Sequence, residues 1–135
     1  MNAAAKIRLC DALLGCSFLV ILASGLQLEA TSGRYVWSVW AHIVAGMVFV
    51  TLSYYHIFLH YRRSNWFRRF AKNKSTVSRI LWWMFLLTAV SGVIATMVWI
   101  DGYCHTPMGG VHGKLGLVMS IVAVVHVVQK RRHRG

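Results

Sequence analysis

Four long apolar runs, separated by short stretches of polar and basic residues, dominate the pattern of this chain. They lie near residues 11–29, 35–61, 77–100 and 108–129. A helix needs about 20 residues to cross the roughly 30 Å hydrocarbon core of a bilayer, and each run has about that length. The pattern therefore predicts an all-α integral membrane protein, folded as a four-helix bundle in a single transmembrane domain over residues 1–135.

The first run also resembles a signal peptide, because Lys6 and Arg8 precede it. It continues past Gly25 without a convincing small-residue cleavage site, which favours a retained helix.

Composition agrees with a membrane solvent. Of the 135 residues 57% are hydrophobic, a larger share than a small soluble core can bury, and only three residues are acidic. The net charge of +12 comes from basic blocks between the apolar runs, so it indicates topology and contact with anionic lipids rather than nucleic-acid binding. The three cysteines form neither a paired CxxC zinc site nor a CxxCH haem-attachment motif.

The basic residues are distributed unevenly between the two sides of the predicted membrane. Two precede the first run, seven lie between residues 62 and 79, and four follow residue 129, whereas Arg34 and Lys114 are the two on the other side. The positive-inside rule then predicts a cytoplasmic N-terminus, C-terminus and middle loop, in a cell inner membrane.

Two of the runs carry histidines at the same interval. His42 and His56 are 56 − 42 = 14 residues apart, and His112 and His126 are 126 − 112 = 14 apart. In a helix, fourteen residues end about 40° short of four full turns and rise about 21 Å. Each pair is therefore expected on one face of its helix, with its members near opposite membrane surfaces.

Because one helix intervenes between them, the two histidine-bearing helices should be parallel. His42 then lies level with His112, and His56 with His126, which gives two bis-histidine sites suited to two non-covalent haems b. The simpler interpretation is four polar side chains bonded to neighbouring helices. Ionisable groups in hydrocarbon are costly and usually functional, so four at matched depth favour ligation. Zinc is less favoured, because the sequence shows no cysteine or carboxylate at ligand spacing.

Small and basic residues accompany these histidines. Four glycines are candidates for accommodating the porphyrin edges, or for close helix packing: Gly25, Gly46, Gly92 and Gly116. Four basic residues are candidates for pairing with haem propionates, or for lipid contact: Arg34 and Lys114 outside, Arg62 and Arg63 inside.

His60 is the main alternative to His56 as an inner ligand. It lies 60 − 42 = 18 residues after His42, which is five full turns, so it also faces inward. The repeated interval of fourteen favours His56, and leaves His60 to contact a propionate, a quinone or interfacial water.

A weak internal repeat links the two halves of the chain. Ser24 and Gly25 recur as Ser91 and Gly92, with an offset of 91 − 24 = 67, and His42 recurs as His112 with an offset of 112 − 42 = 70. The sequence therefore suggests two related helical hairpins.

With its two ligand helices and their glycines, the chain resembles the membrane-bound di-haem cytochromes b. It resembles especially the N-terminal four-helix bundle of the cytochrome bc complex, and the cytochrome b subunits of respiratory hydrogenases and formate dehydrogenases. It departs from them in having no histidine in the first helix and incomplete glycine pairs. The resemblance implies electron transfer between a quinone pool and a partner redox subunit.

Two alternatives stay open at this point. One is a stand-alone quinone-linked oxidoreductase of the superoxide oxidase type. The other is a haem-free transporter or assembly factor that uses its histidines as proton relays or as contacts between helices.

Overall fold

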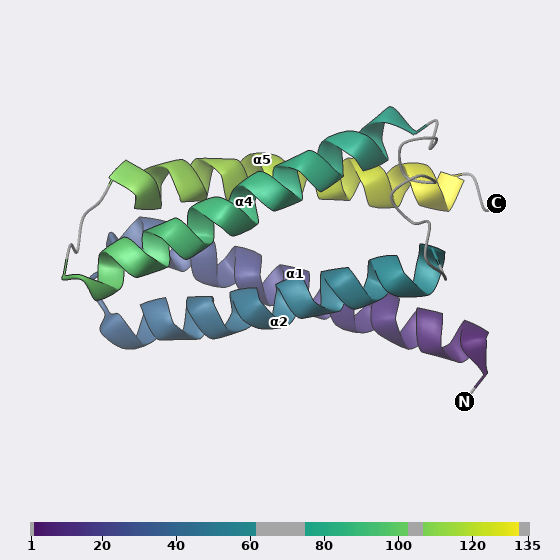
Figure 1. Cartoon of the computed structure of the whole chain (residues 1–135), viewed down its shortest axis with the longest axis horizontal. Coiled ribbons are helices and arrows are strands. Elements are labelled where there is room, and N and C mark those ends of the chain that lie inside the picture. The colour runs from purple at the N-terminus through teal and green to yellow at the C-terminus, as the bar shows by residue number, and fades with distance from the viewer. Residues whose placement is uncertain (1, 62–74, 103–106, 133–135) are drawn as a thin grey trace. The chain divides into compact units, whose positions relative to one another are not determined.

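The computed structural model describes residues 2–61, 75–102 and 107–132. In these ranges the chain forms four helices, α1 (Ala3–Thr31), α2 (Val36–Tyr61), α4 (Thr76–Ile100) and α5 (Pro107–Arg132), shown in Figure 1. The predicted all-α class and the four helices are confirmed.

Each helix is long and apolar enough to cross a membrane. The four candidate spans have 25 to 28 residues, which corresponds to at least about 37 Å of helix against roughly 30 Å of hydrocarbon. Large apolar side chains on all four helices face outward; Leu19 is 64% exposed and Trp83 is 63% exposed. Among the described residues only Cys10 and Met119 are buried hydrophobics. The apolar surface is that of a membrane protein, whose helices face lipid.

The largest difference from the predicted boundaries is at the start of α1. This helix begins at Ala3 instead of near residue 11, because the Asn2 side chain caps it by accepting a hydrogen bond of 2.9 Å from the Ala5 backbone N–H. Lys6 and Arg8 limit the apolar run on its N-terminal side, but the helix continues through them. Asp11 consequently lies well inside α1, with two helical turns before it.

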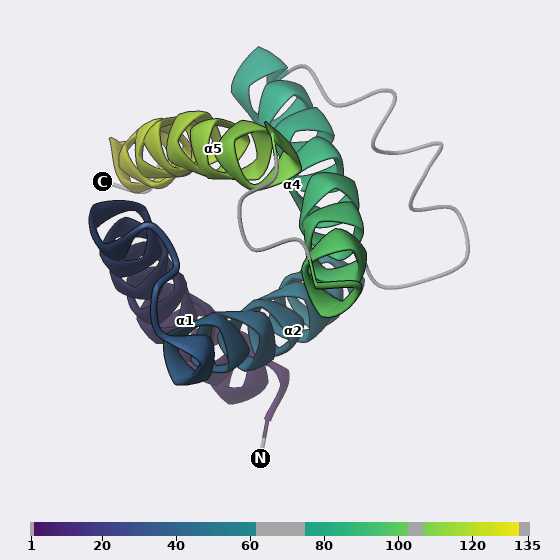
Figure 2. The ribbon, with the colours of Figure 1, turned by 90° about the vertical axis from the view of Figure 1, so that its left-hand side faces the viewer.

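The first unit, Met1–Ala71, contains a hairpin of α1 and α2. A short turn reverses the chain: Ser32 (φ 50°) and Gly33 (φ 64°) both adopt left-handed conformations, and the Gly33 N–H donates to the Leu28 carbonyl over 2.9 Å. The two helices therefore run antiparallel, side by side (Figures 1 and 2). Phe18 and Phe49 pack between them with ring centroids 6.2 Å apart.

The second unit, Lys72–Gly135, contains a hairpin of α4 and α5. Ser75 caps α4 by accepting from the Ser78 N–H, and Pro107 opens α5, where its missing N–H would have no helical partner. The two helices contact each other along the hairpin. Both units therefore have the same construction, a helix followed by an antiparallel histidine-bearing helix.

Candidate functional site

In the first hairpin, His42 of α2 bonds to Ser24 of α1. Its Nδ1 lies 2.8 Å from the Ser24 hydroxyl oxygen, and that hydroxyl donates to the Ile21 carbonyl over 3.0 Å. With its one proton given to Ile21, the Ser24 hydroxyl can accept from an Nδ1–H of His42. A neutral His42 then carries its proton on Nδ1 and a lone pair on Nε2.

His112 has the corresponding arrangement in the second hairpin. Its Nδ1 lies 3.1 Å from the Ser91 hydroxyl and 3.1 Å from the Thr88 carbonyl oxygen. A carbonyl can only accept, and the Ser91 hydroxyl donates to that same carbonyl over 3.0 Å. The Nδ1 of His112 therefore donates, and the lone pair is again on Nε2.

The other two histidines bond to α1 and α4 in the same way. Nδ1 of His56 lies 2.9 Å from a carboxylate oxygen of Asp11, and a carboxylate accepts. Nδ1 of His126 lies 3.3 Å from the hydroxyl of Ser78, which donates to the hydroxyl of Ser75. Nδ1 of His56 is therefore the donor, and Nδ1 of His126 can be the donor in the same way.

One geometric feature is thus common to His42, His56, His112 and His126. Each is half-buried, and each directs Nδ1 to an acceptor on the preceding helix of its own hairpin. Histidines that bind metal ions usually donate their other ring N–H to such an acceptor, which fixes the tautomer and the ring orientation. The donor set therefore fits axial ligation of a haem iron through Nε2.

The acceptors follow the internal repeat. In α1 the acceptors are 24 − 11 = 13 residues apart and in α4 they are 91 − 78 = 13 apart, so Asp11 corresponds to Ser78 at the offset 78 − 11 = 67. The prediction from the sequence covered this offset for Ser24 and Ser91 and left out Asp11. Asp11 is the functional candidate that it missed.

Gly25 and Gly92 make room for the histidine rings themselves. A Cβ at Gly25 would lie 3.3 Å from Cε1 of His42, and one at Gly92 would lie 2.9 Å from Cε1 of His112. The sequence predicts a place for these glycines beside a porphyrin edge or in helix packing. The structure gives them a more local reason, because the imidazole packs against the backbone of the preceding helix.

The other two glycines are less constrained within their hairpins. A Cβ at Gly46 would lie 3.5 Å from Cδ1 of Ile21, and one at Gly116 would lie 3.9 Å from Cγ2 of Thr88. Both distances are ordinary contacts, so the place of Gly46 and Gly116 beside a porphyrin stays a prediction.

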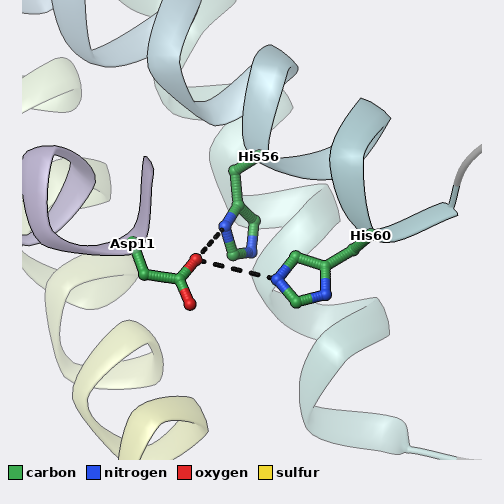
Figure 3. A group of neighbouring side chains, drawn as sticks. All are labelled: Asp11, His56 and His60. Carbon is green, nitrogen blue, oxygen red and sulfur yellow. Dashed lines mark hydrogen bonds and ion pairs between the residues drawn. The ribbon is translucent and has the colours of Figure 1, made fainter. Parts of the chain in front are cut away.

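His60 differs from His56, its neighbour one turn earlier in α2. The centroids of the two rings are 4.5 Å apart, and the ring planes make an angle of 52°. Both rings face Asp11 (Figure 3). His60 approaches Asp11 through Nε2, at 3.7 Å, which is too long for a hydrogen bond. At the repeat offset of 70, His60 corresponds to Lys130 and has no histidine counterpart. Both features separate His60 from the repeated set.

The predicted partners for propionates are placed only in part. The side chains of Arg34 and Lys114 are exposed, while Arg62 and Arg63 lie outside the described residues. Their pairing with propionates stays a prediction. The chain matches no protein-family model, no curated protein sequence and no solved structure.

Proposed function

We propose that this protein is a membrane di-haem b-type cytochrome that transfers electrons between a quinone pool and a partner redox protein across the bilayer. The observation that carries the proposal is a shared contact: Nδ1 of each of His42, His56, His112 and His126 faces an oxygen atom on the preceding helix of its own hairpin. A role limited to holding helices together does not require the same nitrogen in every ring.

In this proposal the histidines pair by depth. His42 and Ser24 lie toward the turn end of their hairpin, and His56 and Asp11 toward the end that carries the N-terminus. His42 and His112 would hold one haem, and His56 and His126 would hold the other. Iron in such sites exchanges single electrons. The rise of about 21 Å between the two histidines of one helix, such as His42 and His56, spans most of the hydrocarbon core.

The hydrogen bonds of the chain would hold each ligand ring in place. A fixed ring lowers the rearrangement that accompanies a change of iron charge, and an acceptor on Nδ1 makes Nε2 a stronger donor. His56 has a carboxylate as its acceptor, whereas the other three have hydroxyl or carbonyl groups. The two haems would therefore have different surroundings, and the surroundings of a haem tune its reduction potential.

Haem extraction tests the proposal directly. Because four ligands make two axial pairs and no covalent attachment motif occurs, acid-acetone should release two haems b per chain from the purified protein. A reduced-minus-oxidised spectrum should show b-type bands. A colourless protein would contradict the proposal and favour the haem-free transporter or assembly factor.

Purification also separates two cytochrome functions. A subunit of a larger complex should co-purify with a redox partner, whereas a stand-alone oxidoreductase of the superoxide oxidase type should be active with quinone alone.

The orientation proposed from the basic residues places both termini and the middle loop in the cytoplasm. Single cysteines at Asn73 and Gly135, which lie outside the described residues, should be protected from an impermeant thiol reagent added to intact cells. A cysteine at Ser32, in the turn between α1 and α2, should react. The background for all three is a chain without its native cysteines. Reaction at Asn73 with protection at Ser32 would show the opposite orientation.

A further inference from the structure

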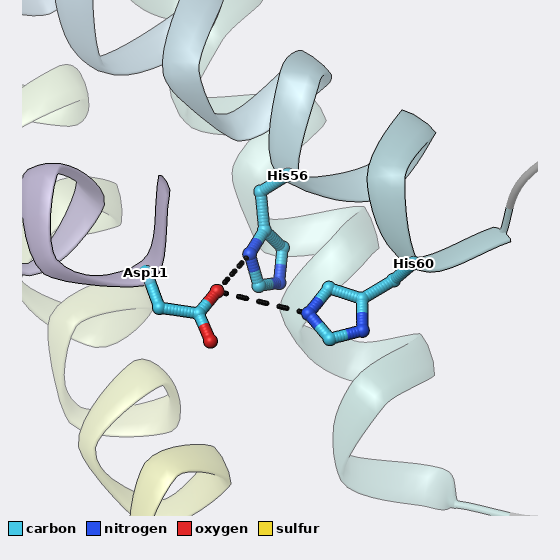
Figure 4. A network of polar contacts seen from close by, with 3 residues as sticks. All are labelled: Asp11, His56 and His60. Carbon is cyan, nitrogen blue, oxygen red and sulfur yellow. Dashed lines mark hydrogen bonds and ion pairs between the residues drawn. The ribbon is translucent and has the colours of Figure 1, made fainter. Parts of the chain in front are cut away.

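Three potential metal ligands meet at one end of the first hairpin. Oδ1 of Asp11 in α1 and one ring nitrogen each of His56 and His60 in α2 all lie within 4.8 Å of one another (Figure 4). The nitrogens that face Asp11 are Nδ1 of His56 and Nε2 of His60. Haem ligation through Nε2 of His56 does not explain why His60 also faces the Asp11 carboxylate.

The spacing of these atoms suits a tetrahedral ion. Zinc bonds to nitrogen and oxygen of about 2.0–2.1 Å, at tetrahedral angles, place two ligand atoms roughly 3.3 Å apart. The distances from the Asp11 oxygen are 2.9 Å to His56 and 3.7 Å to His60, one below and one above that value. Small side-chain movements would equalise them.

The local structure also presents the ligands as a zinc site does. Two histidines four residues apart lie on one face of a helix, which is the spacing that zinc-binding helices use. The third ligand comes from the facing helix. The side chains of Asp11, His56 and His60 are 36%, 29% and 32% exposed, so an ion and a water molecule as the fourth ligand have access.

We propose that Asp11, His56 and His60 bind one Zn²⁺ ion, through Oδ1, Nδ1 and Nε2 respectively. The ion takes the place of the proton on Nδ1 of His56; that proton moves through water to Nε2 where Nε2 holds no iron, and is released to water where it does. The site itself does not depend on the haem proposal, because all of its ligands belong to the first hairpin.

Zinc titration of the purified full chain tests the site. We expect one Zn²⁺ per chain, with the affinity lowered by at least about tenfold in Asp11→Asn and in His60→Ala. Matched controls are Glu29→Gln, a carboxylate elsewhere on α1, and His133→Ala, a histidine of the C-terminal tail; both should keep the wild-type affinity. X-ray absorption at the zinc edge should show two imidazole nitrogens and a carboxylate oxygen.

The outcomes separate this site from the proposed function. No zinc bound by the wild-type chain, or unchanged affinity in either Asp11→Asn or His60→Ala, overturns the site. A chain that holds two haems and binds no zinc overturns the zinc site alone. A colourless chain that binds zinc through these three residues supports the site although the cytochrome proposal fails.

Discussion

Replacing His42 or His112 by alanine is expected to remove the same haem component from the reduced-minus-oxidised spectrum and to leave the other in place. His56→Ala and His126→Ala should together define the second component. Since each haem needs an axial nitrogen from both histidine helices, loss of either ligand should cost one of the two haems. Haem content per chain should fall from two to one in all four variants.

The matched control is His60→Ala, one turn from His56 on the same helix. It should keep both components, because His60 has no histidine counterpart in the repeat and faces Asp11 through Nε2. Loss of the inner component in His60→Ala with retention in His56→Ala would show that His60 is the ligand. Loss of both components together in His42→Ala would contradict two separate sites.

The number of helices and their positions along the chain could be predicted from the sequence, because both depend on local properties. Apolar length predicted four helices, and the predicted second run, 35–61, matches α2 almost residue for residue. The interval between His42 and His56 needs only helical periodicity to place both on one face. These properties are set within one helix, so they do not require knowledge of its neighbours.

The hydrogen-bond partners of the histidines could be predicted only in part. Which residue of α1 faces His42 depends on the register between two helices, and the turn at Ser32 and Gly33 sets that register. The predicted first run begins near residue 11, which puts Asp11 at the edge of the span, whereas α1 begins at Ala3 and places Asp11 inside the helix. The repeat offset of 67 was the signal that linked Asp11 to Ser78.

The glycines beside the histidine rings give the second large effect. Gly92→Ala should strongly reduce the component that His112 ligates, because the new Cβ would lie 2.9 Å from Cε1 and 3.3 Å from Nδ1 of that ring. The ring must move away, which stretches the bonds of Nδ1 to Ser91 and Thr88, both now 3.1 Å. Changes to groups that orient a metal ligand typically cost about 10–100-fold in affinity, and haem titration of the variant should show a loss of that order.

Gly25→Ala and Gly110→Ala calibrate this effect. At Gly25 the new Cβ would lie 3.3 Å from Cε1 of His42, so the ring need yield by only a few tenths of an ångström and the loss of affinity should be smaller. At Gly110 of α5 a Cβ would meet nothing within 4 Å, so Gly110→Ala should keep the wild-type spectrum. Haem affinity is therefore expected to be highest in Gly110→Ala, lower in Gly25→Ala and lowest in Gly92→Ala. Full retention of both components in Gly92→Ala would mean that the position of the His112 ring does not govern haem binding, since the alanine cannot fit without moving it.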